Sequence, residues 1–395
     1  MTKLPSLARA RWLNEPSLQR AFSVVAEAGG EARVAGGAVR NALLKIPVGD
    51  VDLATTLGPQ KVVDIFKAAG YGVHPLGIEH GTVMVVISHH TYEITTLRRD
   101  VETDGRRAVV SFTDNWAEDA KRRDFTMNAL YCDARGKIHD YANGYEDILK
   151  NRIIFVGNPA ARIKEDYLRI LRYFRFLSIF ENMKADGPSL AACVRLKKGL
   201  LSLSAERISQ EMFKLLVGPK AVAILKLMAK HGVLKNIIAH TEEFRVLARL
   251  PGDPLLRVFV LAEKPHMLRD AWRLSNVQAR RIDLLASNPM LNPNLRENEQ
   301  RRILYAIGEQ AWRDAVAVNW ARSRASLADR AWKRMLAMPK RWPAPKFPVA
   351  GRDLLAAGFS SGPDVGDELK RLEDFWIAAD FKPTKDELIG KVNDG

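Results

Sequence analysis

The sequence of 395 residues is poor in cysteine and has no long apolar run. Its two cysteines, Cys132 and Cys193, exclude a disulfide framework and a cysteine-based zinc site, and they fit a reducing compartment. No stretch approaches the roughly 18 uncharged apolar residues that a membrane-spanning helix needs, so we expect no membrane partner. Internal repeats and low-complexity tracts are absent too. A globular chain remains, and its length favours about two or three domains.

Positive charge, in contrast, is abundant. Lys and Arg number 61 against 46 Asp and Glu, a formal net charge of +15, which favours a polyanionic partner such as nucleic acid. Residues 151–215 hold 12 basic against 6 acidic side chains, and residues 296–346 hold 12 against 5. Together, the two segments favour a surface for phosphates and stacked bases over a merely solvated helix face. Most tryptophans of the second segment are expected in the core, and one or two exposed ones would suffice for stacking: Trp312, Trp320, Trp332 and Trp342.

The hydrophobic pattern divides the chain in two. Between residues 32 and 141, short β-type runs alternate with turns, and the runs GTVMVVI (81–87) and YEITTLR (92–98) predict a hairpin. After about Asn151, nearly every segment has helical periodicity. We therefore predict an α+β fold, in which a head of mixed sheet and helices is followed by an all-helical remainder.

A pair of carboxylates suggests metal chemistry in the head. Asp50 and Asp52 stand two residues apart in GDVDLAT, which reads as a strand, so both side chains would share one face. Two such carboxylates repel unless a cation lies beside them, and hard oxygen donors suit Mg²⁺ with substrate phosphates. Glu93, on the second strand of the hairpin, would complete a site for two ions. The alternative for Glu93 is a cross-strand pair with Arg98 or a nearby lysine.

A glycine pair precedes these carboxylates. Gly36 and Gly37 end a predicted strand and open a predicted helix over 38–44, which contains Arg40. Backbone N–H groups at a helix start, with no Cβ in the way, can contact a phosphate. A Gly-Gly pair alone is usually only a turn. Close before the two aspartates, it is placed to hold a triphosphate beside the metal site.

The order of the motifs resembles a known family. GGAVR, DVDLAT and the strand glutamate have the arrangement of the DNA polymerase β nucleotidyltransferase superfamily. Further along, the chain reads RRDFTMNAL (122–130), DYANGYEDI (140–148), EDYLRILRYFRF (165–176) and LSAERISQEM (203–212). Together these motifs resemble the class II tRNA nucleotidyltransferases, the CCA-adding enzymes, whose near relatives are bacterial poly(A) polymerases. Two positions depart from the family pattern, Asn41 where Asp is usual and Lys45 where Gly is common.

The resemblance implies roles for residues of the head. The metal would be held by Asp50 and Asp52, with Glu93 as the third catalytic acid, and two Mg²⁺ ions are implied. The triphosphate would be contacted by Gly36, Gly37 and Arg40. Arginine can fork onto phosphate, while Asp and Asn can hold ribose hydroxyls. The residues implied to face the nucleotide and its ribose are Arg122, Arg123, Asp124 and Asn128, and a salt-bridged strand–helix junction is the alternative.

Further roles are implied for EDYLR and the helix after it. The i,i+3 spacing predicts that Asp166 and Arg169 share one helix face. The resemblance makes them, with Arg172, a protein template for the base edge of CTP or ATP. UTP and GTP would leave buried polar groups unpaired, at about 1–3 kcal/mol each. An ordinary ion pair is the alternative. The residues implied to brace the neck are Glu165, Glu206 and Arg207.

The resemblance also implies a domain plan. The head would span 1–150, a base-recognising neck 151–220, a body 221–295 and a tRNA-binding tail 296–395. Residues 100–115 would form a mobile loop that helps switch from C to A addition. The turn GPDVG at 362–366 would present N–H groups to RNA phosphate, with a helix corner as the alternative.

The implied activity is template-independent addition of CCA to tRNA 3′ ends from CTP and ATP. The terminal hydroxyl would attack the α-phosphate in line with the help of two metal ions, and the basic helices would hold the acceptor arm and elbow. The alternatives are a poly(A) polymerase, an enzyme that adds only CC or only A, and a non-catalytic tRNA-binding protein. We expect a cytoplasmic protein, with the mitochondrial matrix as the alternative. The oligomeric state does not follow from the sequence.

Overall fold

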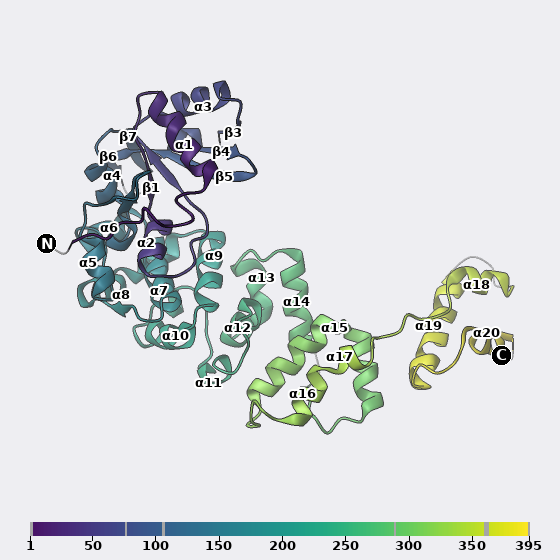
Figure 1. Cartoon of the computed structure of the whole chain (residues 1–395). Coiled ribbons are helices and arrows are strands. Elements are labelled where there is room, and N and C mark those ends of the chain that lie inside the picture. Colours follow the sequence, from purple (N-terminus) through teal and green to yellow (C-terminus); the bar gives the residue numbers. More distant parts are fainter. Residues whose placement is uncertain (1–2, 76, 105–106, 288–289, 359–362, 394–395) are drawn as a thin grey trace. The chain divides into compact units, whose positions relative to one another are not determined.

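The computed structural model describes residues 3–75, 77–104, 107–287, 290–358 and 363–393, with only the backbone for residues 100–104, 107–110 and 392–393. The chain divides into two compact units, Met1–Ile238 and Ala239–Gly395. Strands and helices form the first unit, and the second contains helices only in its described part (Figure 1). The predicted α+β class is confirmed. The finer division into head, neck, body and tail stays a prediction.

The first unit is built on a mixed sheet of seven strands in the order β3-β4-β5-β2-β1-β8-β9. β2 and β5 pair in parallel, and the other neighbours are antiparallel. The strands are β1 (Ala32–Ala35), β2 (Leu53–Thr55), β3 (Gly72–His74), β4 (Thr82–Ile87), β5 (His90–Thr96), β8 (Leu130–Cys132) and β9 (Ile138–Asp140).

Helices cover one face of this sheet, and the opposite face, which we call the open face, is exposed at β5 although the residues of β1, β2 and β8 are all buried. Alternation along β5 buries Tyr92 and Ile94 and exposes Glu93 on the opposite face. The covering helices are α1 (Pro16–Glu27) and α3 (Pro59–Ala68), which contact β4. Ser17 of α1 hydrogen-bonds to the Tyr92 hydroxyl at 2.7 Å. The open face is therefore the one that can hold a substrate.

Two hairpins belong to this unit. β4 and β5 confirm the predicted hairpin, and its turn residues Ser88 and His89 both have positive φ, as a two-residue hairpin turn requires. The segment expected as a mobile loop over 100–115 instead forms an antiparallel pair, β6 (Arg98–Asp104) and β7 (Arg107–Phe112). The β-branched residues of RAVVSF favour this extended backbone, although the segment has weak periodicity. The tip of the expected loop, residues 105–106, lies outside the described residues.

The helices after the sheet pack around α7 (Leu168–Ile179). Its apolar stripe of Ile170, Leu171, Phe174 and Leu177 is buried, as the periodicity predicted, and α7 contacts α9 and α10. The remaining helices of the unit are α2 (Gly37–Leu43), α4 (Trp116–Arg122), α5 (Gly144–Leu149), α6 (Pro159–Glu165), α8 (Gly187–Leu196), α9 (Ala205–Leu216) and α10 (Ala221–Lys230). A short parallel pair, β10 (Arg152–Ile153) and β11 (Lys184–Ala185), lies among them in the sequence.

Tryptophans contribute to two apolar clusters in the described part of the second unit. One contains Trp312 and Trp332, and the other Leu372 and Trp376. Trp320 and Trp342 are only half-buried and pack against the first of these, so two of the four tryptophans are buried and none is fully exposed. The helices are α11 (Phe244–Leu247), α12 (Pro254–Leu261), α13 (Leu268–Ala271), α14 (Asn276–Ser287), α15 (Glu297–Arg322), α16 (Arg330–Leu336), α17 (Met338–Arg341), α18 (Gly351–Ala356), α19 (Pro363–Ala378) and α20 (Lys385–Asn393).

One expectation for this unit is the turn GPDVG at residues 362–366. Gly362 of the expected GPDVG turn lies outside the described residues, and Pro363 is the first residue of α19.

Among the helices that the structure describes, none combines the length and the apolar character that crossing a membrane requires.

Candidate active site

A cavity of about 640 Å³ in the first unit brings together most of the predicted site residues. Asp50, Glu165 and Glu206 are the predicted residues that do not line it. The predicted residues in its wall are Gly36, Gly37, Arg40, Asp52, Glu93, Arg122, Arg123, Asp124, Asn128, Asp166, Arg169, Arg172 and Arg207. The cavity therefore joins the open face of the sheet to helices far along the chain.

The two aspartates lie on the segment that leads into β2. They precede the strand, which begins at Leu53, whereas the sequence predicted them within it. The backbone carbonyl of Asp52 still accepts a hydrogen bond from the Ala35 N–H at 2.9 Å, so the ladder with β1 continues for one residue more. Because Leu53 is in register with Ile94 of β5, Asp52 lies beside Glu93 on the open face.

These carboxylates repel one another. Burial first, and then the charges of Glu93 and Asp50, raise the pKa of Asp52 above its ordinary value, and Arg123 opposes this. Within the described chain, no hydrogen bond or ion pair is made by the side chains of these three acids. No three Asp, Glu, His or Cys side chains among the described residues are placed to hold a metal ion by themselves. Mg²⁺ typically takes one or two protein carboxylates plus substrate phosphates, so this unpaired acidic set fits a divalent ion.

Gly36 and Arg40 form the adjoining wall. Gly36 has φ +69°, and a Cβ there would approach Arg123 Nη1 at 3.1 Å and the Asn128 carbonyl at 3.3 Å, so only glycine fits easily. Arg40 Nη1 donates to Asn128 Oδ1 at 2.5 Å, and its guanidinium lies 5.1 Å from the Phe176 ring centroid. Burial lowers the pKa of Arg40 to about 10, which leaves the side chain charged at neutral pH.

Both departures from the family pattern have a local explanation. Asn41 Oδ1 accepts hydrogen bonds from Arg40 Nε at 3.1 Å and Nη2 at 2.8 Å, so this residue orients the guanidinium. Lys45 has φ +58°, a left-handed conformation that glycine adopts without strain. The glycine that is common in the family at this position fits the same backbone.

The motif RRDFTMNAL supplies a hydrogen-bonded chain across the cavity wall. Asp124 Oδ2 accepts from Arg172 Nε at 2.7 Å, and Asp124 Oδ1 accepts from Asn128 Nδ2 at 2.9 Å. Burial acts to raise the pKa of Asp124, but the Arg172 charge and the Asn128 hydrogen bond outweigh it and hold the pKa below its ordinary value. Arg40 extends the chain through Asn128. The salt-bridged junction left open by the sequence is therefore present, and it lines the cavity.

Asp119 was missed by the sequence analysis although it lines the cavity. Its carboxylate accepts hydrogen bonds from the Tyr131 hydroxyl at 2.7 Å, from Arg123 Nη2 at 3.1 Å and from the backbone N–H of Arg98 at 3.2 Å. Arg123 is thereby held in the wall, and the first residue of β6 is tied to the same carboxylate. The i,i+4 spacing of Asp119 and Arg123 was the available signal.

Asp166 does not share a helix with Arg169, contrary to the prediction from their spacing. α6 ends at Glu165 and α7 begins at Leu168, and Asp166 between them has an extended backbone. Its Oδ1 accepts from the Leu168 N–H at 3.0 Å, because aspartate caps a helix more readily than it extends one. Its Oδ2 accepts from Arg207 Nη2 at 2.7 Å.

The residues predicted to brace the neck differ in their placement. Glu165 Oε2 accepts from Arg169 Nη1 at 2.6 Å and also pairs with Arg162 at 2.6 Å. Glu206 is exposed in the first turn of α9. Glu211, one turn beyond Arg207 on α9, was not singled out, yet it is buried and its Oε1 accepts from Arg175 Nη1 at 3.2 Å.

Comparisons with known proteins agree with this geometry. The family described as Poly A polymerase head domain matches residues 32–154. The family described as probable RNA and SrmB-binding site of polymerase A matches residues 182–244. The first match contains the glycine pair, the three acids and the RRDFTMNAL motif, and Gly36, Gly37, Asp52, Glu93, Arg122, Arg123, Asp124 and Asn128 of these line the cavity.

Relatives cover most of the chain. A CCA tRNA nucleotidyltransferase 1, mitochondrial, of Danio rerio is 34% identical over 92% of this chain and 87% of its own length. A CCA-adding enzyme of Enterococcus faecalis is 35% identical over 72% of each chain. The crystal structure of the Bacillus stearothermophilus CCA-adding enzyme in complex with CTP has a TM-score of 0.80 and 28% identity, and covers 96% of this chain and 98% of that one. The chain therefore belongs to the family of CCA-adding tRNA nucleotidyltransferases.

Proposed function

We propose that this protein adds CCA to the 3′ ends of tRNA, using CTP and ATP and no nucleic-acid template. One observation carries the proposal: a single cavity joins Asp52 and Glu93 of the sheet to Asp166 and Arg169 between and on the later helices. Nucleotide transfer needs the acidic set. Choosing a nucleotide without a template strand needs protein groups that face the base, and both sets open onto the same space.

Nucleotidyltransferases of this family use a divalent metal, and we assign Mg²⁺ and two ions to this chain. Asp50 and Asp52 would hold the metal, and Glu93 would complete the acidic set. When bound, the metal lowers the pKa of the attacking hydroxyl and neutralises charge on the leaving pyrophosphate. The raised pKa of Asp52 supports this assignment, because a cation would relieve the repulsion among the three acids.

Residues beside the acids would hold the triphosphate and the sugar. Gly36 and Gly37 leave the backbone accessible, and the charged Arg40 lies in the same wall. Arg122 and Arg123 add positive charge to the cavity. The Asp124 and Asn128 pair would present oxygen and amide groups to the ribose, at a position set by their existing hydrogen bonds with Arg172 and Arg40.

Base selection is assigned to Asp166, Arg169 and Arg172. Carboxylate Asp166 can accept from the exocyclic amine of cytosine or adenine, and a guanidinium can donate to ring nitrogens or a carbonyl. Arg207 and Glu165 would act through these residues, since Arg207 donates to Asp166 and Glu165 accepts from Arg169. Uracil and guanine carry a carbonyl where cytosine and adenine carry the amine, so the Asp166 carboxylate would lose its donor.

The acceptor arm and elbow of tRNA would be held by the basic helices, which predicts that affinity falls as salt rises. The cytoplasm stays our predicted compartment. The mitochondrial matrix is the alternative, and the Danio rerio, Mus musculus and Homo sapiens relatives are named mitochondrial.

The test is nucleotide incorporation by the purified protein with Mg²⁺. Three tRNAs, lacking CCA, ending in C or ending in CC, each receive CTP, ATP or both, and products are resolved at single-nucleotide length. Growth to CCA followed by a stop is expected. Addition of CC alone or of A alone would identify a partial enzyme, and a long A ladder would identify a poly(A) polymerase. No growth on any acceptor, with tRNA still bound, would favour a non-catalytic tRNA-binding protein.

A further inference from the structure

A second concave site lies within the C-terminal unit. A cavity of about 360 Å³ is lined by three arginines together with Glu297 and Gln300, and we call it the arginine pocket. We propose that the arginine pocket binds backbone phosphates of the RNA substrate, an inference that rests on the proposed function. Its arginines are Arg330, Arg334 and Arg341.

The geometry of α16 and α17 brings the three guanidiniums together. Arg330 and Arg334 are four residues apart on α16, so they lie on one face of the helix, and Arg341 is the last residue of α17. All three side chains are exposed. Gln300 of α15 and Leu295 line the same cavity.

The charge of the arginine pocket is not neutralised within the protein. In the described part of the chain, neither Arg330 nor Arg334 has a hydrogen-bonded or ion-paired side-chain partner. Arg341 Nη2 lies 3.5 Å from Glu297 Oε1, but Arg301 takes the same carboxylate oxygen at 3.1 Å. Three cations thus face one acid that is already shared.

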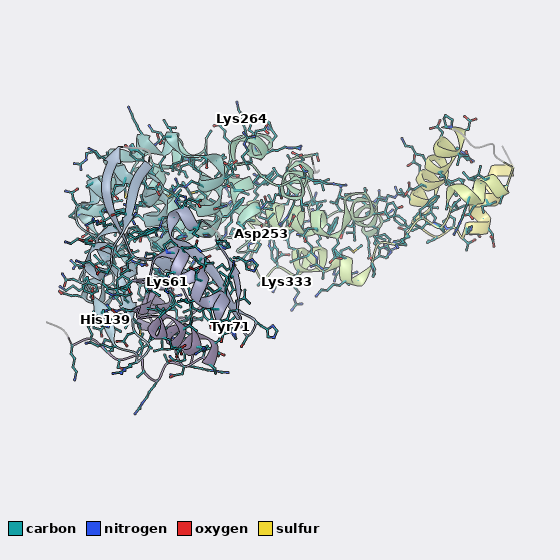
Figure 2. The ribbon with its side chains drawn as sticks, turned by 90° about the horizontal axis from the view of Figure 1, so that it is seen from above. Lys61, Tyr71, His139, Asp253, Lys264 and Lys333 are labelled. Atoms are coloured by element: carbon teal, nitrogen blue, oxygen red, sulfur yellow. The ribbon has the colours of Figure 1, made fainter. Side chains whose placement is uncertain are left out.

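An arginine elsewhere in the same unit shows the contrast. Arg281 binds Asp314 at 2.5 Å and Asp253 at 2.6 Å, so its charge is balanced by the protein itself. The guanidiniums of the arginine pocket have donors left over in a concave surface, and phosphate is the group that a guanidinium fork matches. Lys333, labelled in Figure 2, is exposed on α16 and adds to the same positive field.

Acidic charge in the last helices narrows where RNA can bind. Residues 347–395 hold 6 basic against 10 acidic side chains, whereas residues 296–346 hold 12 against 5. On α19, Asp364, Asp367 and Asp374 are exposed. Net negative charge in this part of the predicted tail disfavours phosphate, so the proposed phosphate-binding surface is assigned to residues up to about 346.

The test compares two double variants of the full chain that remove equal charge. Arg330→Ala/Arg334→Ala removes two of the three arginines of the arginine pocket. Lys370→Ala/Lys382→Ala removes two exposed lysines from the acidic residues 347–395. Binding of a tRNA lacking CCA is measured by titration at several salt concentrations. The pocket variant should lower the slope of log K against log salt by about 1.5–2 and weaken binding by about 10–100-fold near 0.1 M salt. The lysine variant should stay within about twofold of the parent, because long-range charge contributes little at this salt.

Equal losses in the two variants, or no loss in the pocket variant, would overturn the proposal. Unchanged melting temperatures show that both variants fold. Pyrophosphate, titrated by calorimetry, separates a free polyphosphate from RNA as the occupant. Pyrophosphate binding that the pocket variant abolishes, with tRNA binding intact, would also overturn it. Turnover distinguishes failure of this proposal from failure of the proposed function. A pocket variant with raised KM for tRNA and unchanged kcat supports the arginine pocket and the proposed function. A parent that binds tRNA through the arginine pocket but adds no nucleotide contradicts only the proposed function.

Discussion

The candidate active site and the arginine pocket hold their cations in opposite ways. In the active-site cavity, Arg172 is bound to Asp124 and Arg207 to Asp166, so both guanidiniums have a set position before any nucleotide binds. In the arginine pocket, Arg330 and Arg334 are exposed and make no such pair within the described chain. A site that discriminates between bases needs oriented hydrogen bonds, whereas a surface that holds a phosphate chain needs mainly charge.

The two arrangements should also differ in what a single substitution costs. A buried ion pair that loses one partner leaves an uncompensated charge, which is strongly destabilising. An exposed arginine without a partner can be removed with little effect on folding. Function and stability should therefore change together at the Arg172–Asp124 pair, whose carboxylate is buried, and separately in the arginine pocket.

The largest expected effect is on turnover. Asp52→Ala should lower nucleotide incorporation on the order of 10³-fold, because the site loses a carboxylate assigned to hold the metal ion that would stabilise the charge on the reacting phosphate. Binding of tRNA, measured by titration, should change by less than about twofold, since the cationic surfaces remain. Asp64→Ala, which removes an exposed carboxylate on α3, is the matched control and should leave incorporation unchanged. Loss of tRNA binding in Asp52→Ala would contradict the metal-site assignment.

The second effect is on stability. Asp119→Ala should lower the free energy of unfolding by about 3 kcal/mol, because Arg123 and the Tyr131 hydroxyl lose a buried acceptor. Arg334→Ala should change it by less than about 0.5 kcal/mol. Urea unfolding followed by circular dichroism measures both variants. Similar changes in the free energy of unfolding of the two variants would contradict the contrast between Arg123, which is held by Asp119, and Arg334, which has no partner in the described chain.

Nucleotide choice should change by a smaller factor. Asp166→Ala should reduce the preference for CTP over UTP by about 10–100-fold, as expected for the loss of one buried hydrogen bond. Arg207→Ala should reduce it by about tenfold, because Asp166 would remain but lose the partner that orients it. Single-turnover incorporation with each nucleotide gives the ratio. An equal fall in the rates with CTP and UTP would count against a template role for Asp166.

The smallest effect is thermal and depends on pH. The folded-state pKa of Asp52 is raised, so its contribution to stability is complete below the unfolded pKa of 3.8 and is lost as pH rises through the folded pKa. Asp52→Asn should therefore raise Tm by about 1–2 °C at pH 7 without metal. Mg²⁺ should raise the Tm of the parent at pH 7 and leave the variant nearly unchanged. If Mg²⁺ does not change the Tm of the parent, that result would argue against ion binding at this site.

Much of the site could be predicted from local sequence. The glycine pair needs a backbone that glycine alone adopts easily, and the structure has φ +69° at Gly36. The β-type pattern placed Glu93 on the second strand of a hairpin, and helical periodicity marked the buried stripe of α7. These features are short-range, because strand and helix periods are properties of neighbouring residues.

The error at Asp166 has a local cause, and the omission of Asp119 has a distant one. Asp166 was expected on a helix, but its side chain takes the capping hydrogen bond of Leu168 and the helix is interrupted there. Asp119 was not singled out, because its partners Tyr131 and the Arg98 N–H lie on other elements. Spacing along the chain cannot rank such residues when the groups that make them important are distant in sequence.

The sequence by itself determined the β4–β5 hairpin, the buried stripe of α7, the chemical inventory and the position of the charge excesses. Those properties depend on each residue and its neighbours. Only the tertiary structure decided that Asp52, Glu93, Asp166 and Arg169 open onto one cavity, and that Arg330 and Arg334 remain without partners while Arg281 is paired. The reason is physical: a carboxylate or guanidinium acts on whatever lies within a few ångströms of it, and the packing of distant segments sets those neighbours.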